Sequence, residues 1–275
     1  MKPAELTYLR VSTKAEALAR LAEAGQDARL LAGGQSLVPM LNLRIARPSH
    51  LVDIGRLAEL NRLGVVDGEL YIGALVRHHV LAEHPLLARL VPVLAEAAGH
   101  IGHPAIRHRG TLAGSLAHAD PSGELMAVAM LLDATVLVES SAADAREVPA
   151  RELVLGPYET VLEPDEMITW LRVAAPRGGR TGFYEIVRRT GDFAVAGAAV
   201  QLPDDDAEPA VAVTFGAGAG YRVASVRPPD GTGTMAETLA ELAHPEDGEH
   251  GRLRRTAVER AVRAARARGG AEDDG

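Results

Sequence analysis

The stretch Leu30-Leu31-Ala32-Gly33-Gly34-Gln35-Ser36-Leu37 leads from an apolar segment through paired glycines to the start of a predicted helix. Glycines have no Cβ atom, so they permit positive φ angles and the close approach of a phosphate. Such a turn directs several backbone N–H groups towards one point, and the Ser36 hydroxyl is a further donor. A simple strand–turn–helix connection has the same pattern, and the spacing is neither that of a Rossmann fingerprint nor that of a P-loop. The stretch alone therefore leaves a structural turn and an anion site as alternatives.

The flanking residues predict a small β-α-β-α-β unit over residues 1–55. Thr13 begins a capping-box pattern with Glu16, and apolar residues at helical spacing follow as far as Gly25. Ser36 is the expected cap of a second, shorter helix that ends near Leu41. The expected strands cover residues 7–10, 28–32 and 51–54.

The remaining sequence predicts a mixed set of strands and helices. Residues 63–73 are typical of a β-hairpin with Asp67-Gly68 as its turn. Helices are expected over residues 76–83, 86–98 and 125–132, and strands over residues 134–139 and 167–173. After a predicted linker at residues 177–180, strands over 194–201, 210–215 and 221–226 precede helices over 234–242 and 251–268. Strands followed by helices indicate a separate C-terminal α+β domain.

A second segment, Gly110 to Glu124, consists mainly of small and polar residues inside an irregular stretch that begins at His100. Long irregular segments inside a compact domain are usually functional. Asp120 precedes a proline, which favours an extended conformation, and its carboxylate suits the hydroxyls of a ribose or ribityl chain. An ordinary surface loop that starts a helix is the alternative. Two such segments in one chain favour a bound dinucleotide, with N–H groups from both bends directed at one diphosphate.

Composition excludes several classes of function. The chain has 275 residues and a formal net charge of −8, so no general electrostatic attraction to nucleic acid is expected. It has no cysteine, which excludes disulfides and thiolate-bound clusters. The arginines near the C-terminus lie among acidic residues and read as a solvated helix face. No apolar stretch is long enough to predict membrane insertion and none resembles a signal peptide, so we expect a cytoplasmic protein.

The sequence offers no catalytic group and no metal site. Two histidine pairs, His100-x-x-His103 and His78-His79, could be metal ligands. The chain has no cysteine, no H-E-x-x-H motif and no clear 2-His-1-carboxylate group, so we interpret these histidines as polar loop residues. Ser115 lies outside any G-x-S-x-G nucleophile motif. A protein whose cofactor transfers electrons needs no acid or base of its own.

Three stretches resemble the FAD-binding medium subunit of the molybdenum hydroxylases, the family of carbon monoxide dehydrogenase and xanthine dehydrogenase. They are Ala32–Leu37, Ile101 to Pro121, and Phe183-Tyr184-Glu185-Ile186-Val187-Arg188-Arg189-Thr190-Gly191-Asp192-Phe193-Ala194. The resemblance implies an α+β fold in which two FAD-binding subdomains, of the vanillyl-alcohol oxidase and MurB-like type, precede a C-terminal α+β domain. The domains would cover residues 1–55, 56–176 and 181–270.

The resemblance also implies FAD as the cofactor and assigns its contacts. Residues 32–36 would bind the pyrophosphate through backbone amides, together with Thr111, Gly114 and Ser115, while Ile101 and Leu162 would lie near the flavin ring. Asp120 and Glu124 would contact the sugar and ribityl portions. The full cofactor-binding set is Ala32, Gly33, Gly34, Gln35, Ser36, Leu37, Ile101, Thr111, Gly114, Ser115, Ala117, Asp120, Glu124 and Leu162.

In this family a large molybdopterin subunit hydroxylates the substrate, and electrons pass through a small [2Fe–2S] subunit to FAD and then to an external acceptor. The resemblance therefore implies both subunits as partners. The C-terminal domain departs from the family pattern at Tyr221-Arg222 and at Glu249–Arg254. This departure motivates an alternative function, a free-standing FAD-dependent oxidase or monooxygenase that acts on a small molecule. A third alternative is a protein that keeps the fold without binding flavin.

Overall fold

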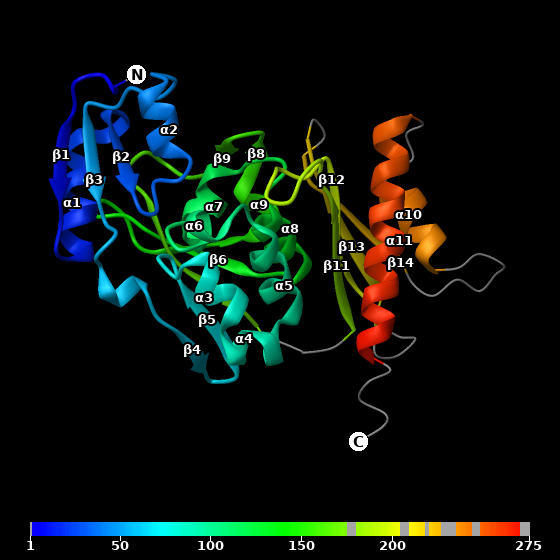
Figure 1. Ribbon diagram of the computed structural model, residues 1–275. Helices are drawn as coiled ribbons and strands as arrows, with labels where there is room; N and C mark the ends of the chain where they lie inside the picture. The colour runs from blue at the N-terminus through cyan, green and yellow to red at the C-terminus, as the bar shows by residue number, and fades with distance from the viewer. Residues whose placement is uncertain are drawn as a thin grey trace. The chain divides into compact units, whose positions relative to one another are not determined.

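The computed structural model describes residues 2–174, 180–203, 209–217, 220–226, 235–243 and 248–269 (Figure 1). Residues 177–179 of the predicted linker lie outside this part of the chain. Two compact units are present, and each combines separate segments: residues 1–78, 104–119 and 134–174 form the first unit, and residues 79–103, 120–133 and 175–275 form the second. The α+β fold class is confirmed, while the division at residues 55, 176 and 181 stays a prediction.

The first unit begins with the β-α-β-α-β arrangement that the sequence predicts. β1 (Thr7–Arg10), β3 (His50–Asp53) and β2 (Ala28–Leu31) form a parallel sheet in that order, joined by α1 (Lys14–Ala24) and α2 (Leu37–Asn42). The side chain of Thr13 accepts a hydrogen bond from the Glu16 N–H, as expected of the cap of α1. Single 3₁₀ turns lie at Gly25–Asp27 and Ala58–Leu60.

Ser36 does not cap α2, and the prediction that it does so is wrong. Its backbone is already helical, with φ −94° and ψ −47°, and its side chain makes no capping hydrogen bond. An N-cap residue needs an extended backbone for its side-chain oxygen to reach the N–H groups of the first turn. The hydroxyl of Ser36 is consequently exposed beside the glycine turn.

A five-stranded antiparallel sheet completes the first unit. Its order is β4 (Leu63–Val66), β5 (Glu69–Gly73), β10 (Met167–Val173), β6 (Thr135–Glu139) and β7 (Arg146–Pro149). The predicted hairpin turn is confirmed, since Asp67 and Gly68 both have positive φ, as a type I′ turn requires. Four short elements were not predicted: β7, α9 (Ala150–Leu153), β8 (Val154–Gly156) and β9 (Glu159–Thr160).

The stretch from His100 to Glu124 is more regular than the sequence predicts. It contains α6 (Pro104–Arg107) and α7 (Leu112–His118), and the latter is capped by Thr111. α7 has a glycine and several small residues, so its composition conceals its helical periodicity. Buried Leu112 and Leu116 anchor it to the core of the first unit.

The second unit is built on an antiparallel sheet in the order β11 (Thr181–Ile186), β12 (Ala196–Gln201), β13 (Ala210–Phe215) and β14 (Arg222–Val226). β12 to β14 confirm the predicted strands, whereas β11 was missed. The helices are α3 (His78–Glu83, from His79 onward), α4 (Pro85–Leu90), α5 (Pro92–His100), α8 (Glu124–Leu131), α10 (Met235–Ala243) and α11 (Glu249–Gly269). α8, whose residues are all buried, packs against β12 and β13.

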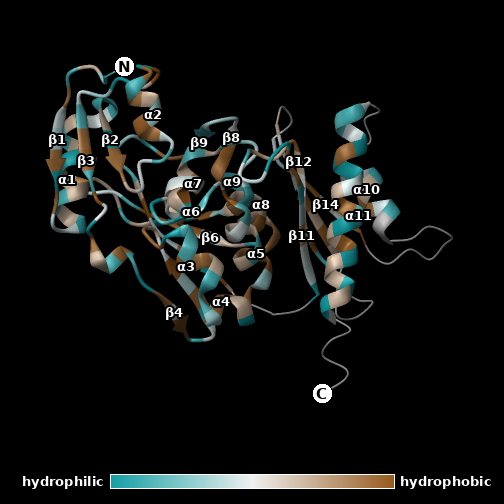
Figure 2. Cartoon of the chain, in the orientation of Figure 1, coloured by the Kyte–Doolittle hydropathy of each residue, from teal (hydrophilic) through white to brown (hydrophobic). Residues whose placement is uncertain are grey.

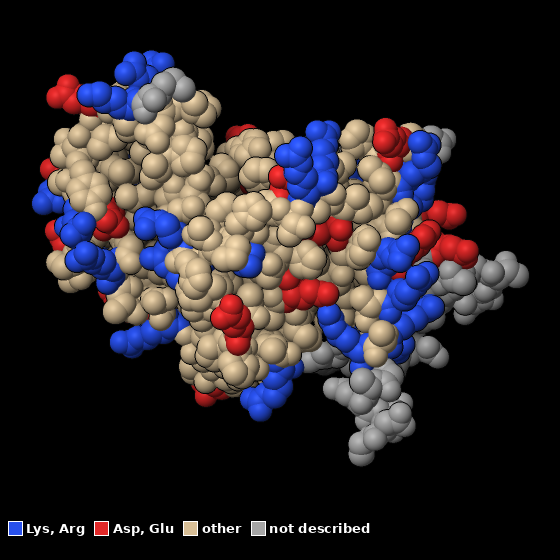
Figure 3. All heavy atoms as spheres, in the orientation of Figure 1, with Lys and Arg blue, Asp and Glu red and all other residues tan. Residues whose placement is uncertain are grey.

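α11 covers the sheet at close range because the facing residues are small. A Cβ atom on Gly182 of β11 would lie 2.7 Å from the backbone nitrogen of Ala265, and Ala257, Ala261 and Ala265 are fully buried. Figure 2 shows hydrophilic and hydrophobic residues alternating along this helix. Its arginines gather on the surface beside acidic residues (Figure 3), as the sequence analysis expects, except that Arg254 is buried. Within the described residues, no helix combines the length and the hydropathy needed to cross a bilayer.

Candidate cofactor-binding site

The turn after β2 presents a run of unpaired backbone donors. Gly34 has φ +73°, and α2 begins when the N–H of Val38 donates to the Gly34 carbonyl at 3.0 Å. Gln35 is held by its own side chain, whose amide donates to the Gly33 carbonyl at 3.1 Å. In the described chain, no protein group accepts from the N–H groups of residues 33–37. These five amides are a concentrated set of donors, as a helix N-terminus that binds an anion requires.

The second segment uses its backbone differently. The N–H of Leu112 donates to Val76 O and that of Ala113 to Ala74 O, both at 3.0 Å. The N–H of Gly114 donates to the Thr111 side chain at 3.2 Å, and the N–H of Ser115 donates to Thr111 O at 3.1 Å. The expectation that both bends direct free amides at one diphosphate is therefore wrong for residues 112–115. Capping and strand pairing satisfy these donors, so the segment presents side chains instead.

The two segments nevertheless meet, as the sequence analysis expects of a single site. Gly33 is buried against the backbone of the second segment, and a Cβ atom there would overlap the Arg109 carbonyl and lie 2.9 Å from Gly110 Cα. Both segments belong to the first unit. Gly33 is required because any side chain would separate the two backbones.

Arg77 bonds to the same Arg109 carbonyl that Gly33 contacts, and it was missed by the sequence analysis. Its guanidinium donates to the Arg109 carbonyl and, at 3.4 Å, to the Gly55 carbonyl. Gly55 is itself fixed by Asp53, whose carboxylate accepts its N–H at 2.8 Å. Burial, followed by the charge of Arg109, lowers the pKa of Arg77. The sequence gives no signal for Arg77 beyond its position before the histidine pair. A side chain that bonds two carbonyls distant in the sequence produces no local motif.

His78 was interpreted as a polar loop residue, but the structure buries it at the start of α3. Its exposed fraction is 4%, and the Cε1 and Nδ1 atoms of its ring lie close to Gly110. Nε2 is 3.0 Å from Thr111 O and 3.0 Å from Ser115 Oγ. The first histidine of the pair is thus part of the scaffold under the second segment.

Comparison with known proteins matches this fold and its first unit to one family. The family model described as the FAD binding domain in molybdopterin dehydrogenase matches residues 4–176. The chain belongs to this family. It is 44% identical over 200 residues to the 6-hydroxypseudooxynicotine dehydrogenase complex subunit alpha of Paenarthrobacter nicotinovorans, covering 72% of this chain and 67% of the relative.

The likeness to other members of the FAD-binding family extends into the second unit. The carbon monoxide dehydrogenase medium chain of Hydrogenophaga pseudoflava is 40% identical over 203 residues, which is 74% of this chain and 70% of that one. The solved carbon monoxide dehydrogenase of Hydrogenophaga pseudoflava that lacks the Mo-pyranopterin moiety superposes with a TM-score of 0.90 at 33% identity. The match covers 98% of this chain and 99% of the other. The C-terminal departures in sequence therefore leave the family fold intact.

The remaining residues of the expected FAD contacts are divided between the two units. Ala117 is exposed on α7, and Leu162 is half-buried just after β9, so both share the first unit with residues 32–37. Ile101, Asp120 and Glu124 lie in the second unit. The glycine turn, Thr111, Gly114 and Ser115 thus share the first unit.

In the second unit Glu124 is a buried carboxyl group at the start of α8. Burial raises its pKa to about 8, and the charges of Glu185 and Asp120 act in the same direction. His100 Nδ1 lies 3.1 Å from Glu185 Oε1, and this hydrogen bond raises the pKa of His100. Because the pKa of Glu124 is about 8, its protonated form predominates at pH 7. A protonated carboxyl both donates and accepts hydrogen bonds, as the hydroxyl groups of a sugar require.

Asp120 is ordered by its own turn. One carboxylate oxygen accepts the Ser122 N–H at 2.9 Å, and the Tyr221 hydroxyl donates to the Asp120 carbonyl. Among the described residues, no three His, Asp or Glu side chains form a group able to hold a metal ion. 

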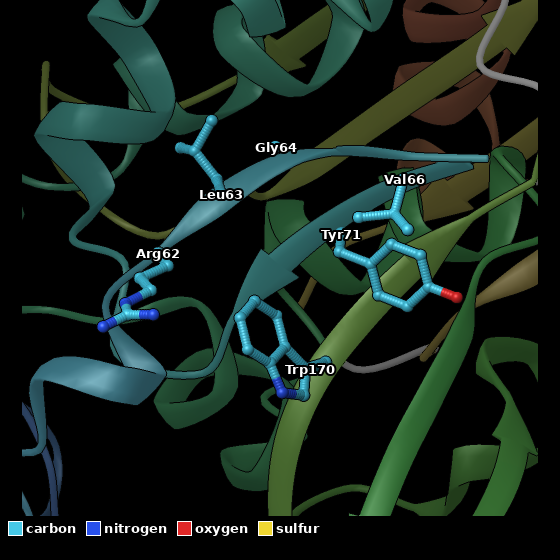
Figure 4. Close-up of a pocket in the computed structure, with 6 residues that line it drawn as sticks. All are labelled: Arg62, Leu63, Gly64, Val66, Tyr71 and Trp170. Atoms are coloured by element: carbon cyan, nitrogen blue, oxygen red, sulfur yellow. The ribbon is translucent and has the colours of Figure 1, made fainter. Parts of the chain in front are cut away.

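A pocket of about 380 Å³ lies elsewhere in the first unit, on β4, β5 and β10. Figure 4 shows Tyr71 and Trp170 among the residues that line it. Their rings are in a T-shaped arrangement, with centroids 6.4 Å apart. Arg62 is the one charged residue among those that line it, so its wall is mainly apolar. A diphosphate does not suit such a wall, and the pocket shares no residue with the glycine turn.

Proposed function

We propose that this chain is the FAD-binding subunit of a molybdenum hydroxylase, with residues 33–37 as the diphosphate site. The observation that carries the proposal is the run of five N–H groups that have no acceptor among the described residues, beside the contact between Gly33 and the Arg109–Gly110 backbone. Leaving donors unpaired beside a packed interface costs free energy unless a ligand or water accepts from them. A diphosphate supplies several charged acceptors in the space of one turn.

The residues fit FAD beyond its diphosphate. Gly34 lacks a side chain at the turn, so a phosphate can approach the backbone closely. Ser36 and Ser115 contribute hydroxyls, while Arg77 and exposed Arg109 contribute positive charge near the junction. Asp120 and protonated Glu124 of the second unit suit the sugar and ribityl hydroxyls. Ile101 of the second unit and Leu162 of the first are aliphatic residues that suit the ring. When bound, FAD supplies the electron-transfer chemistry, and the protein needs only to bind and orient it.

The partners follow from the chemistry of this chain and from its relatives. No cysteine is present, so iron–sulfur clusters with thiolate ligands must be held by another chain. Similar proteins are named as the medium chain of carbon monoxide dehydrogenase and as a subunit of a dehydrogenase complex. We therefore propose that a small [2Fe–2S] subunit and a large molybdopterin subunit assemble with this chain in the cytoplasm, and that electrons leave its FAD for an external acceptor.

The proposal is tested by reconstituting the purified 275-residue chain with FAD. We expect a yellow protein whose flavin is reduced by a reduced [2Fe–2S] partner subunit, and which co-purifies with that subunit and a molybdopterin subunit. A colourless protein that does not bind FAD contradicts cofactor binding. A yellow protein that turns over a small molecule alone and binds neither partner contradicts the subunit function and favours a free-standing flavoenzyme.

A further inference from the structure

His78 places its Nε2 atom within hydrogen-bonding distance of two oxygens of the second segment. Its Nε2 atom is 3.0 Å from the Thr111 carbonyl oxygen and 3.0 Å from Ser115 Oγ. The ring is fixed in this position, since a Cβ on Gly110 would lie 2.6 Å from both Cε1 and Nδ1, and the His78 N–H donates to Gly110 O at 3.1 Å. His78 therefore has no freedom to turn its other nitrogen towards these oxygens.

The carbonyl decides which nitrogen of His78 is protonated. A carbonyl oxygen only accepts, so a short contact with Nε2 requires a hydrogen on Nε2. An Nε2 atom that carries a hydrogen cannot accept from the Ser115 hydroxyl. The Ser115 oxygen is thus a second acceptor for the same N–H, and its own hydrogen points away from the ring.

This arrangement determines what Ser115 offers to its surroundings. Serine hydroxyls in a helix commonly donate to the carbonyl four residues earlier, which here is Thr111 O. That carbonyl already accepts from His78 Nε2 and from the Ser115 N–H at 3.1 Å. In the part of the chain that the structure describes, no protein group accepts from the Ser115 hydroxyl, and the residue is half-buried, so a ligand can reach it.

We propose that His78 is a positioning residue that holds Ser115 as a hydrogen-bond donor to a phosphate of the bound dinucleotide. The proposal rests on the proposed function, because it assigns the donor that the second segment contributes after its amides at 112–115 have been satisfied internally. A neutral imidazole in the other tautomer would accept from Ser115 and remove that donor. The histidine acts through the serine and does not contact the phosphate.

The protonation state is measured directly on the unmodified chain. Long-range ¹H–¹⁵N correlation spectra of the histidine rings, assigned with His78→Gln, report whether Nε2 carries a hydrogen. We expect a protonated Nε2 in the FAD-bound chain. An unprotonated Nε2 with hydrogen on Nδ1 would overturn the proposal, whatever the behaviour of the variants.

The coupling between the two residues is measured through FAD dissociation constants. His78→Leu and Ser115→Ala should each weaken FAD binding by about tenfold or more, the value of one hydrogen bond to a charged group. The double variant should bind as Ser115→Ala does, within about twofold, because His78 acts only through that hydroxyl. His78→Gln retains an N–H near the Nε2 position and should stay close to the unmodified chain.

The control is His108→Gln, an exposed histidine in the same unit, which should not alter FAD binding. Thermal unfolding without FAD monitors whether each variant is folded. An unchanged FAD affinity in His78→Leu overturns the positioning role while leaving FAD binding in place. So does a double variant whose fold loss of FAD affinity is the product of the two single losses. Failure of the unmodified chain to bind FAD would instead overturn the proposed function.

Discussion

Gly33 contacts the backbone of Arg109 so closely that a single methyl group between them would overlap the Arg109 carbonyl. The two residues lie far apart in the sequence but in the same compact unit. Their contact places a turn rich in free N–H groups beside a segment whose own amides are satisfied by capping and strand pairing. The site therefore combines amides from the first segment with side-chain hydroxyls from the second.

Replacing Gly33 by alanine should separate the two segments. We expect a loss of stability of about 1–3 kcal/mol, typical of overpacking, and a loss of FAD affinity of at least about tenfold. Gly64→Ala is the matched control, because no atom lies within 4 Å of a Cβ built on Gly64. Urea unfolding and FAD titration of both variants test this prediction. Equal FAD affinity in Gly33→Ala and the unmodified chain would show that the contact is not needed.

Removing the Arg77 guanidinium should loosen the same junction. Arg77→Met keeps the aliphatic stem but loses the hydrogen bonds to the carbonyls of Arg109 and Gly55. We expect a stability loss of about 1–3 kcal/mol and weaker FAD binding. Arg29→Met serves as the control, since the bonds of exposed Arg29 within the described residues go to the nearby carbonyls of Gln26 and Ala28. Similar affinities in the two variants would contradict this role of Arg77.

Variants of two threonine caps should distinguish effects on stability from effects on FAD binding. Thr13 caps α1 and Thr111 caps α7, each through a hydrogen bond from the N–H three residues later. Thr13→Val and Thr111→Val should each cost about 1 kcal/mol of stability, as expected for a lost cap. Only Thr111→Val should also weaken FAD binding, because α7 carries Ser115. A comparable loss of affinity in Thr13→Val would mean that affinity merely follows stability.

Glu124 should make stability fall as the pH rises. Burial raises its pKa to about 8, so the folded chain holds this proton more tightly than the unfolded chain does. The free energy of unfolding therefore falls as the pH rises from about 4.5 to about 8, by on the order of 4 kcal/mol in total. Glu124→Gln should remove this term, leaving stability similar at pH 5 and higher than that of the unmodified chain at pH 9.

Glu166 provides a control of opposite sign. Its hydrogen bond to Arg146 lowers its pKa, so its contribution to stability is present near neutral pH and is lost as the pH falls. Glu166→Gln should destabilise the chain at pH 7 and have less effect at acidic pH. Urea unfolding of both variants without FAD measures the two profiles. Parallel profiles for Glu124→Gln and the unmodified chain would contradict a protonated Glu124.

The sequence predicts those features of the fold and site that local patterns encode. The Thr13 cap, the Asp67-Gly68 turn and the strand Ala28–Leu31 before the glycine turn all follow from neighbouring residues. α7 was missed because its small residues hide its periodicity, and β11 was missed because its sequence, TGFYEI, has little alternation. Ser36 was misassigned because a serine before a helix caps it only when its backbone is extended.

The features that sequence reasoning missed in the site depend on contacts between distant segments. Arg77 meets Arg109 and Gly55, and His78 meets Ser115, through the tertiary fold alone. The pairing of the amides at 112 and 113 with Val76 and Ala74 likewise depends on a neighbouring segment. Such pairing decides which donors remain for a ligand, and no spacing rule within residues 110–115 reveals it.

The most direct test is an amide NMR titration of the ¹⁵N-labelled chain with FAD, with riboflavin, which lacks phosphate, as the comparison. We expect the N–H signals of residues 33–37 to shift on addition of FAD and to stay in place with riboflavin, while those of the Asp67-Gly68 turn are unaffected by either. FAD binding that leaves the signals of residues 33–37 unmoved would contradict the diphosphate site.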